Sequence, residues 1–379
     1  MKRILIFMMT ALLSVGAWAE NLWSGSETLN YYGFQLTETK SMSAGDVLTF
    51  TVSGTTQSWA GIKLKTVARS SDDTYNVPGT ELISTSAAVG TVKIVVTSEV
   101  AAAAADKGLW LDGNDCTVTS VDLEKKQATL NLYSSDEGTT VNYWGSGLSK
   151  AMFGAVQKGD LLTVTIKSVG ADWGANLSVT TKDGGDGNVE LATAFISPDA
   201  LPTTVKILFT DDMVTAAKSN GLYLNTGTYT YTSVDIVYTP TVNISSAGYA
   251  TFGYPVALDL TGIEAYTVTV SGGKAQLNSI QNKKIPAGTG IILKGSGDVT
   301  MPLTTETTDD ITGNDLKVSD GTVTGDGTIF VLGQNGGKVG FGKLKSGDVL
   351  AAGKAYLTIP SESRSFIDID DNVTGIQQV

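Results

Sequence analysis

The chain contains no histidine and only one cysteine among its 379 residues. The lack of histidine excludes Ser-His-Asp and Cys-His catalysis and every histidine-ligated metal site. The single Cys116 excludes an intrachain disulfide, and the two absences together exclude a structural zinc site. Without a disulfide, ordinary hydrophobic cores must hold the domains together. We expect Cys116 itself to be a small buried residue in a strand.

Proline is scarce, with 8 residues, and the only long hydrophobic run lies at the N-terminus. Lys2 and Arg3 precede this run, and Ala17-Trp18-Ala19 has the small-x-small pattern of a cleavage site. The pattern predicts a signal peptide over residues 1–19 and a mature chain that is secreted, outside the cell or at its surface. Because the run is too short for a membrane span and no other segment approaches one, we expect no membrane insertion.

Acidic residues outnumber basic ones: the chain has 26 Lys and Arg and 38 Asp and Glu, which gives a formal net charge of −12. An acidic surface repels nucleic acid and anionic lipid, so neither is an expected partner. The same charge suits solubility and neutral ligands.

What the chain has is glycine, 43 residues of it, and many short β-branched runs. Residues 47–52, 91–96 and 162–166 alternate apolar and polar side chains between turns rich in Gly, Asp and Asn. Strands at this spacing, without long helical patterns between them, predict an all-β fold of antiparallel sandwiches.

Two stretches of the chain repeat each other at an offset of about 110 to 114 residues, which is a domain-sized period. The matched segments are Asn30-Tyr31-Tyr32-Gly33 with Asn142-Tyr143-Trp144-Gly145, Gly45-Asp46-Val47-Leu48-Thr49 with Gly159-Asp160-Leu161-Leu162-Thr163, Gly108-Leu109-Trp110-Leu111 with Gly221-Leu222-Tyr223-Leu224, and Thr119-Ser120-Val121-Asp122 with Thr232-Ser233-Val234-Asp235. A duplicated module with aromatics in register suggests two copies of one binding function, kept for avidity.

We therefore expect a first β-sandwich repeat over 20–126, a second over 127–240 and a third β domain over 241–379. One short helix is expected in each repeat. Ser98 and Asp211 serve as the expected N-terminal signals, and Gly108 and Gly221 as the C-terminal ones.

The paired aromatics are the candidate ligand-binding residues, because Trp and Tyr rings stack on the flat apolar faces of sugars. The six candidates are Tyr32, Trp59, Trp110, Trp144, Trp173 and Tyr223.

Strand parity places Trp110 and Tyr223 opposite their flanking leucines, hence outward if the leucines are core. Trp59 is out of phase with the strand that follows it whereas Trp173 is in phase, so either a bulge intervenes in one copy or one tryptophan is core. Tyr32 and Trp144 suit loop tips, and Trp23 and Tyr133 are expected to be packing residues.

The acidic residues give no clear metal or catalytic site. The Asp/Gly/Asn clusters at 112–115 and 183–188 could offer oxygen ligands to calcium, but neither has EF-hand spacing and both read first as turns. No cofactor is otherwise expected. Gly45-Asp46 and Gly159-Asp160 are likewise read as turns. A glycosidase needs two carboxylates in one cleft, and nothing singles out such a pair, so we do not expect an enzyme.

These motifs resemble the jelly-roll, carbohydrate-binding-module-like domains of secreted Bacteroidetes proteins, twice over residues 20–240. The resemblance rests on framework residues such as Leu22-Trp23-Ser24-Gly25, the Gly-Asp strand, the internal Trp and Gly-Leu-x-Leu. Residues 248–356 are similar to a β domain found near the C-termini of such proteins. The resemblance implies jelly-roll sandwiches and a sugar-binding role.

The expected function is binding of a polysaccharide through exposed aromatics of two tandem modules, with the third domain as a spacer or an attachment module that contacts protein partners. The rival is a structural or adhesive surface protein that binds protein partners. The polysaccharide-binding hypothesis predicts exposed aromatics on a sheet face or loop. The structural or adhesive alternative predicts buried aromatics and an exposed edge strand.

Overall fold

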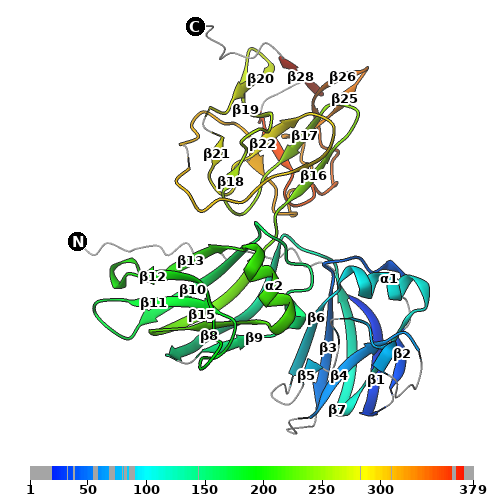
Figure 1. The fold of residues 1–379 in the computed structure, drawn as a ribbon. Coiled ribbons are helices and arrows are strands. Elements are labelled where there is room, and N and C mark those ends of the chain that lie inside the picture. Colours follow the sequence, from blue (N-terminus) through cyan, green and yellow to red (C-terminus); the bar gives the residue numbers. More distant parts are fainter. Residues whose placement is uncertain are drawn as a thin grey trace. The chain divides into compact units, whose positions relative to one another are not determined.

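The computed structural model describes residues 19–31, 33–36, 39–53, 59–67, 73–78, 80, 83–84, 90–143, 145–281, 283–308, 310–360 and 364–370. The expected signal peptide, apart from Ala19, lies outside the described residues. Within them the protein is all-β, with many antiparallel sheets and two short α-helices, as predicted. It divides into two compact units, one ending at Thr239 and the other beginning at Pro240 (Figure 1).

The first unit contains both sequence copies, and the described elements of each follow the same order. The first copy holds β1 (Glu20–Asn30), β2 (Phe34–Leu36), η1 (Thr39–Ser41), β3 (Val47–Ser53), β4 (Gly61–Lys65), η2 (Asp73–Tyr75), β5 (Ile83–Ser84), β6 (Gly90–Val95), α1 (Ser98–Asp106) and β7 (Leu109–Glu124). The second holds β8 (Thr129–Asn142), β9 (Ser146–Leu148), η3 (Lys150–Met152), β10 (Leu161–Val169), β11 (Ala175–Thr180), β12 (Glu190–Ile196), η4 (Pro198–Ala200), β13 (Thr203–Leu208), α2 (Asp211–Asn220), β14 (Leu222–Asn225) and β15 (Thr228–Val237).

The second copy is a sandwich of two four-stranded sheets, ordered β13-β10-β15-β8 and β12-β11-β14-β9. The chain passes from the second sheet to the first between β14 and β15, at Thr226 and Gly227. Both residues have positive φ, 69° and 73°. Bends of this kind let one strand direction serve two packed sheets.

In the first copy β7 takes the place of both β14 and β15. Its first half pairs with β2 and β4, and its second half pairs with β1 and β3. The change of partners falls around Asn114 and Asp115, and Asp115 has a φ of 47°. One strand therefore crosses between the two layers of each copy, unbroken in the first and interrupted in the second.

Both helices begin one residue earlier than the sequence signals indicated. Thr97 Oγ1 accepts the Val100 N–H at 3.1 Å and Thr210 Oγ1 accepts the Met213 N–H at 3.2 Å, so the N-caps are threonines rather than Ser98 and Asp211. A cap hydroxyl satisfies the third free amide of the helix, which fixes the start. The predicted glycine endings are correct, because Gly108 follows the C-cap of α1 and Gly221 is the C-cap of α2.

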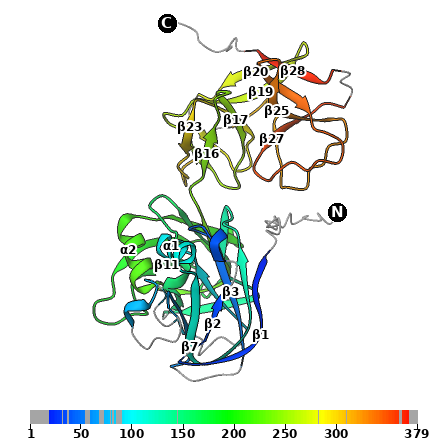
Figure 2. The same cartoon turned by 90° about the vertical axis from the view of Figure 1, so that its right-hand side faces the viewer.

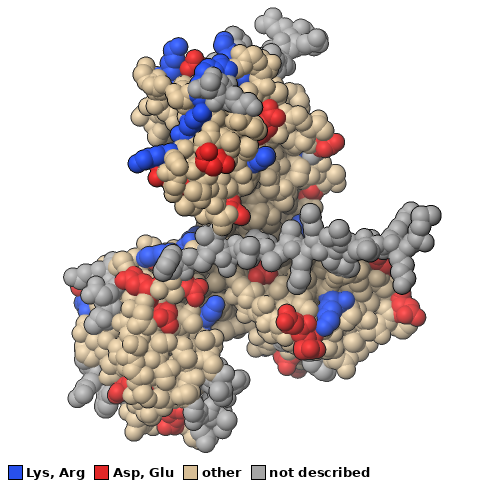
Figure 3. Space-filling model, turned by 180° about the vertical axis from the view of Figure 1, so that it is seen from behind, with Lys and Arg blue, Asp and Glu red and all other residues tan. Residues whose placement is uncertain are grey.

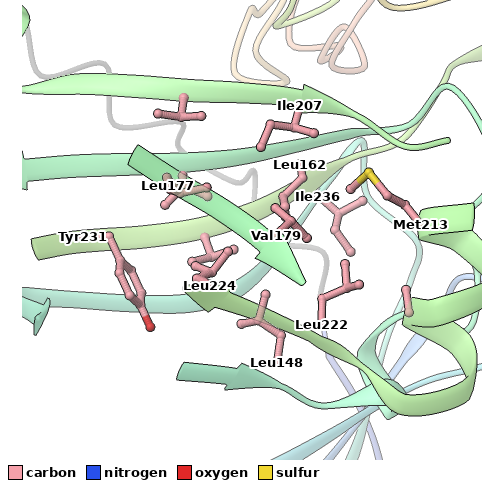
Figure 4. Packing of buried hydrophobic residues seen from close by; sticks show 14 of the residues in the cluster. Leu148, Leu162, Leu177, Val179, Ile207, Met213, Leu222, Leu224, Tyr231 and Ile236 are labelled. Carbon is pink, nitrogen blue, oxygen red and sulfur yellow. The ribbon is translucent and has the colours of Figure 1, made fainter. Parts of the chain in front are cut away.

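The inner faces of the two sheets form the core of the second copy (Figure 4). Leu162 and Ile236 from one sheet meet Val179 and Leu224 from the other, and α2 adds Met213. The first copy has an equivalent core, which includes Cys116 at 2 % exposure, as predicted. Alternation along each strand places these side chains on one face.

The two copies also share apolar contacts. Val47 and Val95 of the first copy belong to the core cluster of the second, and Ala151 belongs to that of the first. At this junction a Cβ on Gly154 would come within 2.7 Å of the Thr97 methyl group, so the two copies approach each other too closely for a side chain at position 154. The copies are packed against each other.

Equivalent hydrogen bonds recur at matching positions of the two copies. Asn21 Nδ2 donates to Asp122 at 2.8 Å, and Asn131 Nδ2 donates to Asp235 at 2.7 Å. The same correspondence holds for the Ser120–Thr51 and Ser233–Thr165 hydroxyl pairs, at 2.9 and 3.0 Å.

Asp46 and Asp160 close their copies. Asp160 accepts the Gln157 N–H at 2.9 Å, which is the predicted turn, and also the Thr239 N–H at 2.7 Å, just past the last strand. Asp46 makes the matching bonds to the N–H groups of Ser43 and Lys126, both at 2.9 Å. We call each set an aspartate clamp, because one buried carboxylate ties the start of a strand to the exit of its module.

The described residues of the second unit form β-strands joined by turns and loops, with no helix. The strands are β16 (Thr241–Ile244), β17 (Tyr249–Phe252), β18 (Leu258–Asp259), β19 (Ala265–Ser271), β20 (Lys274–Ser279), β21 (Lys284–Ile285), β22 (Ile291–Lys294), β23 (Gly297–Thr300), β24 (Lys317–Val318), β25 (Ile329–Asn335), β26 (Lys338–Lys343), β27 (Ala355–Thr358) and β28 (Phe366–Asp370). Nine of them form one sheet, ordered β17-β22-β19-β20-β28-β26-β25-β27-β24, in which β20 and β28 run parallel (Figure 2). Its core gathers Val268, Ile292, Phe330 and Phe341.

No helix in the described part of the chain is long and apolar enough to cross a membrane.

Asp160→Ala should lower the free energy of unfolding by about 2 kcal/mol, because it removes a buried carboxylate that accepts from two partly buried backbone N–H groups. Urea denaturation followed by tryptophan fluorescence measures the change. Asp199→Ala, which removes an exposed carboxylate of the same copy, should change little. An equal loss in the two variants would contradict the clamp.

Asp235→Asn should gain stability relative to wild type as the pH rises. Burial raises the pKa of Asp235 above its usual range, against the opposing hydrogen bonds from Asn131 and Ser233. The folded carboxyl group therefore holds its proton more tightly than the unfolded one, so wild type loses stability as pH rises from about 3.9 through the folded pKa. Unfolding curves between pH 3 and 7 test this, and a constant difference between the two proteins would contradict it.

Candidate functional site

An open hollow of about 420 Å³ lies in the second copy where the chain crosses between its sheets. Its lining comes from the end of β8, the turn between β10 and β11, the end of β12 and the crossing itself. The lining residues are Tyr143, Gly170, Ala171, Trp173, Gly174, Ala175, Asn176, Phe195, Thr226, Gly227 and Thr228.

Three aromatic side chains of this hollow are largely exposed. Tyr143 is 67 % exposed, Trp173 81 % and Phe195 64 %. They come from three different segments of the chain, so the fold and not the local sequence brings them together. Exposed aromatics gathered on one hollow are uncommon on a soluble surface, which makes this hollow the candidate binding site.

Tyr143 is held in a backbone conformation that a side chain rarely adopts. Its φ is 65°, in the left-handed region, which costs an ordinary residue roughly 1–2 kcal/mol. Two hydrogen bonds keep it there: the Tyr143 N–H donates to Gly227 O at 3.0 Å, and the Thr226 N–H donates to Tyr143 O at 3.4 Å. Strain that the surrounding structure maintains is a feature of functional sites.

Glycine is required beside the aromatics because backbone and ring approach it closely. A Cβ on Gly174 would lie 2.4 Å from Ile196 O and 2.7 Å from the Phe195 ring. A Cβ on Gly227 would lie 2.8 Å from Asn176 O. Phe195 therefore rests against Gly174, next to Trp173.

The lining is uncharged. It contains no Asp, Glu, Lys or Arg, and its polar groups are those of Asn176, Thr226, Thr228 and the Tyr143 hydroxyl. The indole N–H of Trp173 has no hydrogen-bond partner within the described residues. On the face drawn in Figure 3, charged side chains likewise form small groups on a largely uncharged surface. The hollow offers ring faces and neutral hydrogen-bonding groups.

The first copy repeats the central part of this arrangement. Tyr31 is 69 % exposed with a φ of 66°, and its N–H donates to Gly113 O at 2.9 Å. Trp59 is 54 % exposed, and its indole Nε1–H donates to an oxygen of Asp115. Both aromatics are thus tied to the crossing segment of β7, as Tyr143 is tied to that between β14 and β15.

The structure resolves the question left open for Trp59 and Trp173. Neither is core, because Trp59 is 54 % and Trp173 81 % exposed, so the alternative of a buried tryptophan does not hold for either copy. Both lie in turns before β4 and β11, so the alternation of the strands does not govern them. Tyr32 and Trp144 lie outside the described residues.

Trp110 and Tyr223 face outward, as strand parity predicted. Leu109 and Leu111 are fully buried, as are Leu222 and Leu224, while the two aromatics are half-buried on the opposite face. They do not line the hollow. The Tyr223 ring lies over Gly147 of the neighbouring strand, where a Cβ would be 2.9 Å away.

The predicted packing role of Trp23 and Tyr133 is confirmed. The Trp23 ring stacks on Phe34 with centroids 4.0 Å apart, and Tyr133 meets Tyr231 edge-on at 5.1 Å. Each is half-buried against the core of its copy.

The exposed aromatics Tyr31, Tyr143 and Phe195 were not among the candidates chosen from the sequence. Tyr31 and Tyr143 stand immediately before the predicted Tyr32 and Trp144, and their repetition in both copies was the available signal. Phe195 has no such signal, but it alternates with the inward-facing Ala194 and Ile196 on β12.

The candidate calcium clusters serve other roles. Asp183 accepts the Gly145 N–H at 2.9 Å, and Asp112 pairs with Lys65 at 3.8 Å with both side chains almost wholly buried. Burial raises the pKa of Asp112. The described residues contain no group of three or more His, Cys, Asp or Glu placed to hold a metal ion.

No model of a known protein family matches the chain, and no curated protein matches it either.

Tyr143→Gly should be about 1 kcal/mol more stable than Tyr143→Ala, because glycine adopts the left-handed conformation without steric cost. Thermal or urea unfolding of the two variants measures the difference. At Phe195, which lies on the extended strand β12, the order should reverse and alanine should be the more stable replacement. Alanine and glycine of equal stability at position 143 would show that no strain is held there.

Proposed function

We propose that the chain is a secreted, non-catalytic carbohydrate-binding protein, and that its second copy binds a neutral sugar in the hollow formed by Tyr143, Trp173 and Phe195. The observation that carries the proposal is the convergence of these three exposed rings from separate segments on one uncharged hollow. Trp and Tyr faces stack on the apolar faces of pyranose rings, and neutral amide and hydroxyl groups bond to the sugar hydroxyls.

The size of the hollow fits a small portion of a glycan. Ligand sites span roughly 300–1,000 Å³, and about 420 Å³ lies near the lower end of that range. The hollow is open, so a longer polysaccharide can continue beyond it.

The absence of an acidic pair in the lining supports binding without hydrolysis. Glycoside hydrolysis places two carboxyl groups on either side of the scissile bond, and the residues that line the hollow include none. We therefore assign the site to recognition, and the net negative charge of the chain disfavours an anionic ligand.

The duplication supports binding to a polymer. Tyr31 and Trp59 present the same exposed pair in the first copy, so two packed copies can engage one polysaccharide and gain avidity without further contacts. The exposure of Trp59 and Trp173 also departs from the buried aromatics that a purely structural protein would need. Under this proposal the second unit, from Pro240 onward, is a spacer or an attachment module for protein partners.

Trp173→Ala and Phe195→Ala should each weaken binding to the preferred neutral polysaccharide about tenfold or more, because truncating a central aromatic contact costs about 2 kcal/mol. Affinity electrophoresis of the full chain in gels containing β-glucan, xylan, mannan or galactan measures the loss. Neither variant should lower the unfolding temperature markedly, since both side chains are exposed.

Val189→Ala is the matched control, because Val189 is 53 % exposed in the same copy and does not line the hollow. Tyr223→Ala tests whether the polysaccharide binds to the outer face of the sheet instead of the hollow, because Tyr223 lies on that face and does not line the hollow. Wild type that migrates unretarded in every gel, or a Trp173→Ala variant retarded as strongly as wild type, would rule out the assignment.

A further inference from the structure

The two copies differ in charge beside their exposed tryptophans. In the first copy Trp59 donates its indole N–H to the Asp115 carboxylate. In the second copy the hollow has no acidic lining, and the Trp173 N–H has no partner within the described residues. Asp172 precedes Trp173 in the sequence, but it does not line the hollow.

Asp115 is an exposed carboxylate that keeps one oxygen available. Its Oδ2 accepts from Trp59, and no described residue donates to Oδ1. No Lys or Arg of the described residues forms an ion pair with it. Its φ of 47° places it on the crossing segment of β7, two residues beyond the Gly113 carbonyl that holds Tyr31.

A carboxylate bound to the edge of an indole changes what the ring attracts. The carboxylate is a strong acceptor for charged donors, and an aromatic face attracts cations. The hydrogen bond from the indole to an anion strengthens the negative character of the ring face. A cationic group placed over Trp59 would therefore meet the ring and the free oxygen of Asp115 together, whereas an anionic sugar would be repelled.

We propose that the first copy prefers glycans that carry protonated amines, such as oligomers of glucosamine, while the second copy takes neutral sugars. This inference rests on the proposed function, because it assigns a ligand class to the exposed Tyr31 and Trp59 of the first copy. The duplication then supplies two specificities rather than two equal sites.

The test compares a glucosamine hexamer with an N-acetylglucosamine hexamer, which differ in the charge of the amine. Isothermal titration is carried out on the full chain carrying Trp173→Ala, so that the second site is weakened and the first dominates the signal. We expect the glucosamine hexamer to bind at least about tenfold more tightly at low salt, and the preference to shrink at high salt because ions screen an exposed carboxylate.

Asp115→Asn in the same background should bring the two affinities together. Asparagine tolerates the left-handed backbone and can still accept the Trp59 N–H, so the variant removes charge and keeps geometry. Asp172→Asn is the matched control, because it removes an exposed carboxylate of the second copy, next to the substituted position 173, and should leave the preference unchanged. Trp59→Ala should abolish the preference and so exclude general attraction of a cation to the acidic chain.

Equal affinity for the two hexamers in the Trp173→Ala chain, or an equal loss for both on Asp115→Asn, would overturn the charge preference. If wild type still binds a neutral polysaccharide through Trp173, the proposed function stands and only the assignment of the first copy fails. If no glycan binds to any variant, both fail together.

Discussion

The passage of one strand between two packed sheets is the constraint on which each copy depends. A strand that leaves one layer and enters the other must bend, and the bend needs positive φ, which Thr226 and Gly227 supply in the second copy and Asp115 in the first. The bend also frees backbone groups that would otherwise bond within the sheet. Gly227 O and Gly113 O accept instead from Tyr143 and Tyr31, which fixes these tyrosines in their strained, outward conformation. The candidate sites are thus a product of how the sandwich closes.

The same geometry explains why the site is rich in glycine. At the crossing, backbones come so close that a single Cβ would collide with a carbonyl oxygen or an aromatic ring. The flat rings of Phe195 and Trp173 then stand beside a floor with few side chains of its own. A neutral lining follows from this composition, since glycine, alanine and threonine carry no charge.

The sequence was sufficient for the fold class and for the inward and outward faces of the Leu109–Leu111 and Leu222–Leu224 strands, but less so for the site. Alternation placed Leu109 and Leu111 inside and Trp110 outside correctly, because period two is a local property of a strand. It failed for Trp59 and Trp173, which sit in turns where no period applies. The repeat itself aligned the tyrosine segments, yet the emphasis fell on Tyr32 and Trp144 rather than on the preceding Tyr31 and Tyr143. Phe195 could not have been found, because its place beside Gly174 depends on pairing between β11 and β12.

The aspartate clamps have a consequence for synthesis on the ribosome. The clamp of the first copy joins residues 80 apart, Asp46 and Lys126, and that of the second joins residues 79 apart, Asp160 and Thr239. Each copy can close once its own exit residue has emerged, and the first closes before most of the second exists. Tandem copies of similar sequence are prone to exchange strands while they fold, and growth from the N-terminus removes the competing partner at the critical time. Val47 and Val95, whose side chains belong to the core of the second copy, then stay uncovered until that copy folds, so the nascent first module presents a small apolar surface for its neighbour.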